Sequence, residues 1–362
     1  MVTIASYRIP QKDLSLVVSF IVLCALYAAS TNSPVSPYLR NSDYIPEVYS
    51  RSLLSESEPH SIHQWAEIDL IPVDQTPSTS QHETALFWHI PKSGGTTLKR
   101  LYKCFGVSIA EKFGAHVQHH QNDTEIISFT PWPKYSRTTY INVDVSNKEG
   151  ILHARDLGLV PSEKANIIIT PLPEFALGTL FDESHKGRFL MLVRHPIERL
   201  VSLFYYLQVA TWEKTYRPSW KNTTLLQWSK SHSKIWKNFL VKKIIGKDDF
   251  TEDEFLEMME TVRKYFVVGL MDEMEESVKR FNAVMKLNVN NNTAFEECMV
   301  EFFGNTDGSS EKKNSNEHPK VLEGSPEWDV LAELNSYDMR LYELILELFD
   351  TQKDIIYSYR SV

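Results

Sequence analysis

A glycine-rich loop after an apolar segment is the part of this sequence best suited to hold a phosphate group. Residues 85–90 are apolar apart from His89 and include two aromatic side chains, which predicts a buried strand that Pro91 ends. Gly94 and Gly95 allow backbone N–H groups to approach an anion closely. A helix is predicted over about 96–104, and a helix N-terminus favours negative charge. This order of strand, loop and helix predicts an anion site.

Lys92 adds a mobile cation beside the loop, where it can follow the charge on a leaving group. Its position argues against a nucleoside triphosphatase or nucleotide kinase. That motif needs a Gly-Lys-Ser/Thr triplet, with the lysine after the glycines and a hydroxyl for magnesium. Here Lys92 precedes Gly94, and no such triplet occurs. A glycine-rich turn with an incidental lysine is the alternative that the loop alone leaves open.

A second segment ends on a cation that suits a phosphate monoester. Residues 188–194 have the composition of a buried strand, and Arg194 is its last residue. His195 and Pro196 end that strand, and the spacing of apolar residues predicts an amphipathic helix over about 196–210. Ser202 lies about two turns into this helix, so that both side chains can meet one anion. A surface arginine with a solvated serine is the alternative.

Together, the two segments resemble the sulfotransferases that use 3′-phosphoadenosine 5′-phosphosulfate (PAPS). Residues 92–97 (Lys-Ser-Gly-Gly-Thr-Thr) look like the 5′-phosphosulfate loop of that family, and residues 194–202 look like its 3′-phosphate site. The resemblance is closest to the Golgi heparan sulfate 2-O- and 6-O-sulfotransferase group. Further similar segments are 203–207, 216–218, 266–270 and 335–343.

The resemblance implies a reaction and a role for each motif residue. An acceptor hydroxyl of a carbohydrate is expected to attack sulfur in line while the adenosine bisphosphate departs, with Lys92 stabilising charge on the leaving oxygen. Arg194 and Ser202 are expected to select PAPS by its 3′-phosphate. The loop is expected to hold the 5′-phosphate through Ser93, Gly94, Gly95, Thr96 and Thr97. This arrangement requires no metal.

The general base is where this sequence departs from the resembled group. The 2-O group uses a histidine upstream of the 3′-phosphate strand, and the equivalent residues 170–175 contain none. Glu174 is therefore the first candidate for the base, because a partly buried glutamate can have a raised pKa. His153 and His185 are the alternatives. The departure leaves open an acceptor-divergent member, or a lumenal glycan-binding protein that kept the fold and lost the base.

The predicted elements alternate strands with helices, which indicates an α/β fold: a parallel sheet flanked by helices, with a P-loop-like phosphosulfate-binding loop. Both anion motifs follow strands, at the carboxyl edge where such sheets bind nucleotides. The region from the first helix to about 150 is polar and predicts irregular loops, and 303–320 predicts a surface insertion. Further strands are predicted at 167–169 and 266–270, and further helices at 173–181, 224–245, 251–263, 272–287 and 327–349.

The N-terminal part predicts a compartment. Residues 14–29 carry no charge and follow basic residues, which predicts a signal anchor with residues 1–13 as a cytoplasmic tail. A cleaved signal peptide is the competing interpretation. Residues 30–83 are rich in polar residues and proline and predict a disordered stem, which leaves 84–362 as the lumenal sulfotransferase domain. The expected protein is a single-pass type II protein of the Golgi membrane.

Cysteine and histidine usage leaves two questions open. Cys104 and Cys298 either pair in an oxidising lumen or stay as two unpaired buried thiols. His116, His119 and His120 form a loose group without metal-ligand spacing, which favours a solvated loop. The sequons that begin at Asn122, Asn222 and Asn291 agree with a lumenal domain.

The net negative charge of the chain indicates which partners it is suited to bind. A formal charge of −9 and a pI of about 5.8 disfavour nucleic-acid binding and suit a polyanionic acceptor poorly. A local basic cluster with two tryptophans can form a sugar groove, or it can be a solvated face with both rings in the core. Its members are Trp228, Lys230, His232, Lys234, Trp236, Lys237, Lys242, Lys243 and Lys247. The acceptor, the hydroxyl position and the oligomeric state do not follow from the sequence.

Overall fold

The computed structural model describes most of the chain beyond residue 69. The described residues are 70–75, 83–117, 120, 123–131, 137–211, 213, 216–231, 233–287, 293–304 and 318–358. The predicted tail, anchor and most of the stem lie outside them. Among the described residues, no helix is both long enough and apolar enough to cross a membrane.

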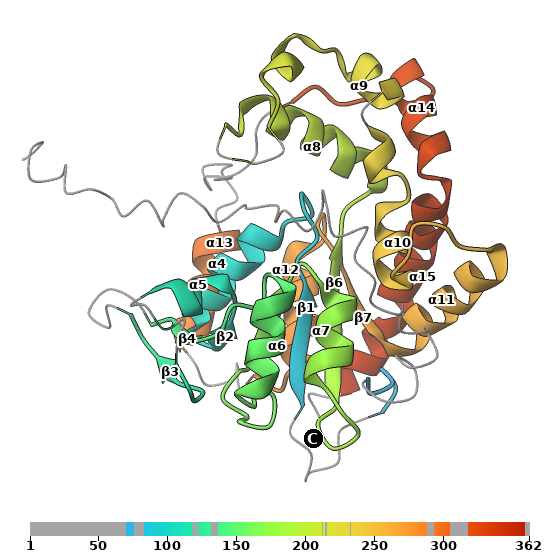
Figure 1. Cartoon of the computed structure of the whole chain (residues 1–362). Helices are drawn as coiled ribbons and strands as arrows, with labels where there is room; N and C mark the ends of the chain where they lie inside the picture. The colour runs from blue at the N-terminus through green and yellow to red at the C-terminus, as the bar shows by residue number, and fades with distance from the viewer. Residues whose placement is uncertain are drawn as a thin grey trace, which may run out of the picture. The chain divides into compact units, whose positions relative to one another are not determined.

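A seven-stranded sheet forms the centre of the described part (Figure 1). Its strands are β1 (Thr84–Trp88), β2 (Ser108–Ala110), β3 (Ser128–Phe129), β4 (Thr139–Ile141), β5 (Ile167–Thr170), β6 (Gly187–Val193) and β7 (Phe266–Leu270). Their order is β3-β4-β2-β5-β1-β6-β7, and every neighbouring pair is parallel except β3 and β4. The predicted parallel sheet is confirmed, with one antiparallel edge strand added.

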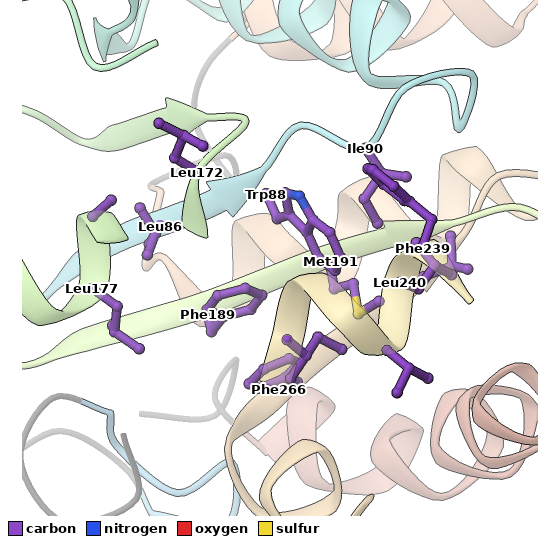
Figure 2. Close-up of a cluster of buried hydrophobic side chains, with 14 of the residues drawn as sticks. Leu86, Trp88, Ile90, Leu172, Leu177, Phe189, Met191, Phe239, Leu240 and Phe266 are labelled. Atoms are coloured by element: carbon purple, nitrogen blue, oxygen red, sulfur yellow. The ribbon is translucent and has the colours of Figure 1, made fainter. Parts of the chain in front are cut away.

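Helices cover both faces of the sheet because its strands are apolar on both faces. Side chains alternate along β1, so that Phe87 packs with α4 (Gly95–Phe105), α12 (Met274–Val284) and α13 (Thr293–Phe303). Trp88 belongs to the opposite core (Figure 2). The helices of that core are α6 (Lys148–Asp156), α7 (Pro173–Leu180), α8 (Pro196–Val209), α9 (Leu225–Ser231), α10 (Phe239–Ile245), α11 (Glu252–Tyr265), α14 (Pro326–Leu334) and α15 (Ser336–Ser358). Figure 1 shows α6 and α7 in front of the sheet and α12 behind it.

Three sequence expectations about elements are wrong. The polar region before 150 holds β2, α5 (Lys112–His116), β3, β4 and α6 rather than irregular loops. The segment 224–245 is not one helix, because Asn238 adopts a left-handed conformation (φ 47°) between the short helices η6 (Ser233–Trp236) and α10. The segment 327–349 is likewise divided, at Asn335 between α14 and α15. Most of the predicted insertion at 303–320 lies outside the described residues.

Residues 70–75, which fall within the predicted stem, pack against the sheet. Leu70, Ile71 and Val73 are buried, and Leu70 bridges Gly187 at the start of β6. The buried guanidinium of Arg188 donates to the carbonyls of Ile71 (3.1 Å), Pro72 (2.7 Å) and Gln75, and to the Glu83 carboxylate (2.8 Å). The packed structure therefore begins before residue 84.

Candidate functional site

The two anion motifs lie side by side at the carboxyl edge of the sheet. β1 and β6 are parallel neighbours in register, with Trp88 opposite Met191, so the loops that follow them leave the same edge. The chain after β1 crosses toward β2, and the chain after β6 crosses toward β7 on the other side. Connections that leave two adjacent strands in opposite directions open a crevice between them, where α/β sheets bind ligands. The predicted placement of both motifs at this edge is confirmed.

The loop after β1 has the backbone of an anion cradle. Lys92 and Gly94 both have positive φ angles, 65° and 81°, and Gly94 is the N-cap of α4. No side chain caps this helix N-terminus, and its first turn holds no acidic residue, which leaves its N–H groups suited to an anion. A Cβ at Gly94 would lie 2.5 Å from Met274 Cε and 3.0 Å from Met271 Cγ, so a side chain there would displace its neighbours.

Ser93 supplies a buried hydroxyl inside this loop. The residue is 1% exposed, and its Oγ makes no hydrogen bond to the described atoms. A buried hydroxyl without a partner is costly, and an oxygen of a bound phosphate would satisfy it. Thr96 and Thr97 follow in the first turn of α4. The residues present therefore fit a 5′-phosphosulfate group.

His89, between β1 and the loop, packs beneath the loop as a neutral ring. Burial and the nearby Lys99 ammonium lower the pKa of His89 to about 3, against the opposing charge of Glu111. Gly95 lies directly on this imidazole, because a Cβ there would be 2.2 Å from His89 Cδ2 and 2.6 Å from Nε2. His89 thus shapes the loop and contributes no positive charge to it.

A buried carboxylate fixes the helix that carries the loop. Glu111 follows β2, and its two oxygens accept from Lys99 (2.8 Å) and Lys103 (2.9 Å), one turn apart on α4. Burial disfavours the charged form of Glu111, but the charges and hydrogen bonds of the two lysines outweigh burial and lower its pKa to about 2. The two ion pairs hold α4, and the loop at its N-terminus, against the end of β2.

We expect Glu111→Gln to lower the free energy of unfolding at neutral pH. We also expect this free energy to depend less on pH in acid than it does in the wild type. A lowered pKa contributes stability above the unfolded-state value near pH 4.5 and loses it as the pH falls toward 2. The contribution is about 3 kcal/mol at most. Chemical denaturation from pH 2 to 7 measures it, with the exposed Glu183→Gln as the matched control. An equal gap between wild type and Glu111→Gln at pH 2 and pH 7 would contradict this role.

The Lys92 side chain reaches across to α8. Its Nζ lies 4.1 Å from the centroid of the Tyr206 ring, within the range of a cation–π contact. Tyr206 is four residues beyond Ser202, so the two side chains share one face of α8. Lys92, predicted from the first motif, therefore contacts the same helix that carries Ser202, predicted from the second motif.

Arg194 directly follows β6, at the carboxyl edge of the sheet. Its side chain is 16% exposed, and its Nε lies 3.3 Å from Oε2 of Glu198 in the first turn of α8. Glu198 is itself 48% exposed, and exposed ion pairs of this kind contribute little, so a phosphate can replace the carboxylate. The neighbouring His195 points elsewhere: its ring stacks on Trp328 (5.2 Å) and meets Tyr342 edge-on (5.2 Å).

Glu174, the predicted base, lies at the correct edge but contacts a different helix from Lys92. It is in the first turn of α7, just after Thr170, whose carbonyl accepts from the His89 N–H (2.9 Å). A Cβ at Gly246, where α10 ends, would lie 2.3 Å from Glu174 Oε1. Burial lowers the pKa of Lys243 on α10, and the Glu174 charge opposes that effect. Its catalytic role stays a prediction.

The two alternative bases are farther from this edge. His185 precedes β6, at the amino end of the strand, and its Nδ1 lies 3.0 Å from Asp182 Oδ1. His153 lies well into α6, which begins at the carboxyl edge after β4, and its buried Nε2 makes no hydrogen bond to the described atoms. The topology therefore favours Glu174 over both histidines.

The basic cluster does not form a tryptophan-lined groove. Trp228 and Trp236 are buried at 0% and 3% exposure, which confirms the alternative that places both rings in the core. Lys242 pairs with Asp248 (3.4 Å), and Lys247 pairs with Glu254. His232 and the Lys234 side chain lie outside the described part.

The histidines of the loose group have carboxylate partners. His116 Nε2 lies 3.0 Å from Asp144 Oδ2, and His120 Nδ1 lies 2.7 Å from Asp123 Oδ2. His119 is outside the described residues. Within the described part of the chain, no group of three or more His, Cys, Asp or Glu side chains is arranged to hold a metal ion.

Sequence reasoning missed four residues around the loop: His89, Glu111, Tyr206 and Glu213. A helical projection would have found Tyr206, since it lies one turn beyond Ser202. Glu111 could not have been found, because the strand before it was not predicted. Glu213 follows α8 and accepts a hydrogen bond from the Tyr206 hydroxyl (2.5 Å).

Comparison with known proteins agrees with this geometry. Residues 78–344, well over half of the chain, match the model of the sulfotransferase family. None of the curated proteins compared with the chain matches it. The matched range contains both anion loops and the strands that carry them, and the fold is the α/β arrangement expected for such enzymes. The chain belongs to the sulfotransferase family.

Proposed function

We propose that the protein transfers the sulfuryl group of PAPS to a hydroxyl of a carbohydrate. The observation that carries this proposal is the pair of loops that follow the adjacent parallel strands β1 and β6, which places Lys92 and Arg194 at one edge of the sheet. The family supports sulfuryl transfer in general. The choice of PAPS rests on the two separate candidate phosphate sites, and the choice of a carbohydrate rests on the resemblance of the two motifs to Golgi enzymes.

In the proposed reaction, an acceptor oxygen bonds to sulfur while the bond from sulfur to the 5′-phosphate oxygen breaks. The amides and hydroxyls of the loop hold the 5′-phosphate, and the Lys92 ammonium stabilises the charge that grows on the leaving oxygen. The guanidinium of Arg194 and the hydroxyl of Ser202 hold the 3′-phosphate. The hydroxyl proton passes to a base, for which Glu174 is our candidate. No metal enters this scheme.

The acceptor and the setting are part of the proposal. The ion-paired Lys242 and Lys247 and the buried tryptophans give no support to a groove for a heavily sulfated chain. A neutral or weakly charged glycan suits the acidic chain better. We place the protein in the Golgi membrane as a type II protein, on the strength of the apolar segment 14–29.

We expect Arg194→Ala to weaken binding of adenosine 3′,5′-bisphosphate about 10–100-fold, since a charge-assisted hydrogen-bond pair is lost. Binding of adenosine 5′-phosphosulfate, which lacks the 3′-phosphate, should change little. Calorimetry of the purified full chain with each nucleotide measures both effects. Arg155→Ala, an exposed arginine of α6, is the matched control. An equal loss for both nucleotides would contradict the assignment of Arg194 to the 3′-phosphate.

A further inference from the structure

Lys92 is held by a specific partner in the structure. The left-handed backbone at Lys92 (φ 65°) directs its side chain to α8, where Nζ lies 4.1 Å from the centroid of the Tyr206 ring. A left-handed conformation is uncommon for a residue other than glycine, and such conformations cluster at functional sites. The ring face and the backbone together limit where the ammonium can go.

Tyr206 is itself fixed by a buried carboxylate. Its hydroxyl donates to Glu213 Oε1 at 2.5 Å, and the two residues are 6% and 4% exposed. The Glu213 backbone is anchored on both sides, because its N–H donates to Ala210 (2.9 Å) and its carbonyl accepts from Tyr216 (3.0 Å). The turn after α8 thus delivers a carboxylate to the tyrosine that faces Lys92.

The chemistry of this arrangement favours one position for the Lys92 ammonium, over the face of the Tyr206 ring. A phenol that donates to a carboxylate gains electron density on its ring, which strengthens its attraction for a cation. The Glu213 carboxylate therefore fixes the Tyr206 hydroxyl, and the Tyr206 ring attracts the Lys92 ammonium.

We propose that Tyr206 and Glu213 are positioning residues that hold the Lys92 ammonium at the phosphosulfate loop. The inference rests on the proposed function, since it assigns them to the sulfuryl-transfer step. They act through Lys92 and need not touch PAPS. The pair aligns the cation before the reaction, so that no reorganisation is required when charge develops on the leaving oxygen.

Kinetics of the full chain test this role. Tyr206→Leu removes the ring, and we expect kcat to fall about 10–100-fold while KM for PAPS changes less than about threefold. Tyr206→Phe keeps the ring and loses the hydroxyl, so its kcat should fall much less. In a Lys92→Ala background, Tyr206→Leu should cause no further loss. Wild-type kcat in Tyr206→Leu, or losses that multiply in the double variant, would overturn the proposal.

A second measurement does not depend on turnover. Lysines carrying ¹³C-methyl groups give NMR signals, and Lys92→Arg identifies the Lys92 signal by its absence. The Tyr206 ring should shift this signal upfield, and the shift should persist in Tyr206→Phe and vanish in Tyr206→Leu. An unchanged signal in Tyr206→Leu would overturn the inference, even if the wild-type protein transfers sulfate. If the Lys92 signal responds as expected but the wild-type protein transfers no sulfate, the placement of Lys92 by Tyr206 is supported. In that case the proposed function is wrong.

Discussion

Lys92→Ala should lower kcat for sulfuryl transfer on the order of 10²–10³-fold, the usual cost of removing one preorganised group that stabilises transition-state charge. In the proposed site the loop amides, Ser93 and Arg194 still hold the nucleotide, so the affinity for adenosine 3′,5′-bisphosphate should fall far less. Steady-state kinetics with PAPS, together with calorimetry on the same samples, separates the two effects.

The control for this prediction is a lysine outside the site. Lys221 is exposed on η5 (Pro218–Asn222), and Lys221→Ala should keep wild-type kcat. Lys92→Arg keeps the charge but spreads it over a larger planar group, so it should recover part of the lost rate. If Lys92→Ala retained a third or more of kcat, the assignment of Lys92 to the leaving oxygen would not stand.

Removal of the disulfide should produce the largest loss of stability. Cys104 near the end of α4 is bonded to Cys298 on α13, across 194 residues of chain. Chain-entropy arguments put the stabilisation from closing so long a loop at about 5 kcal/mol, and observed losses at about 2–5 kcal/mol. We therefore expect Cys104→Ser with Cys298→Ser to lower the free energy of unfolding by that amount.

The oxidised wild type serves as its own reference. Reduction by dithiothreitol should lower its melting temperature toward that of the double variant, and the double variant should not respond. Since α4 carries the proposed phosphosulfate loop at its N-terminus, the destabilised protein should also bind adenosine 3′,5′-bisphosphate more weakly near its melting temperature. A double variant that melts with the oxidised wild type would show that the bond contributes nothing to stability.

The parts of the site that could be predicted are those whose chemistry is local in sequence. The strand before Lys92, the glycines and the helix after them are consecutive, and so are the strand, Arg194 and the helix with Ser202. Their meeting followed from one rule, that parallel strands bring their carboxyl ends to one edge. The structure places the two loops as that rule requires.

The elements that were missed are short or depend on distant contacts. β2 and β4 have three residues each, too few to show a pattern of alternation, and their pairing in the sheet stabilises them. The break at Asn238 depends on two hydrogen bonds to distant residues. The Asn238 N–H donates to the Asn335 side chain (3.0 Å), and the Asn238 side chain accepts from the Tyr337 N–H (3.1 Å). Nothing in the local sequence reveals these partners.

Contacts between residues that are far apart in the sequence could not be predicted either. The sequence left Cys104 and Cys298 either bonded or separate, and the packing of α13 against α4 decides for the bond. The contacts of Lys92 with Tyr206, and of Tyr206 with Glu213, depend on how α8 crosses the end of β1. The general base still rests on sequence reasoning, with Glu174 placed at the right edge by β5.

The most direct test of the account is transfer of ³⁵S-sulfate from PAPS by the purified full chain to a panel of glycans, from unsulfated to heavily sulfated. We predict label on a carbohydrate, with one adenosine 3′,5′-bisphosphate formed for each sulfate transferred and with the strongest labelling on weakly charged acceptors. Nucleotide binding without transfer to any glycan would favour the alternative of a glycan-binding protein on the same fold. Neither transfer nor binding of adenosine 3′,5′-bisphosphate would contradict the central claim.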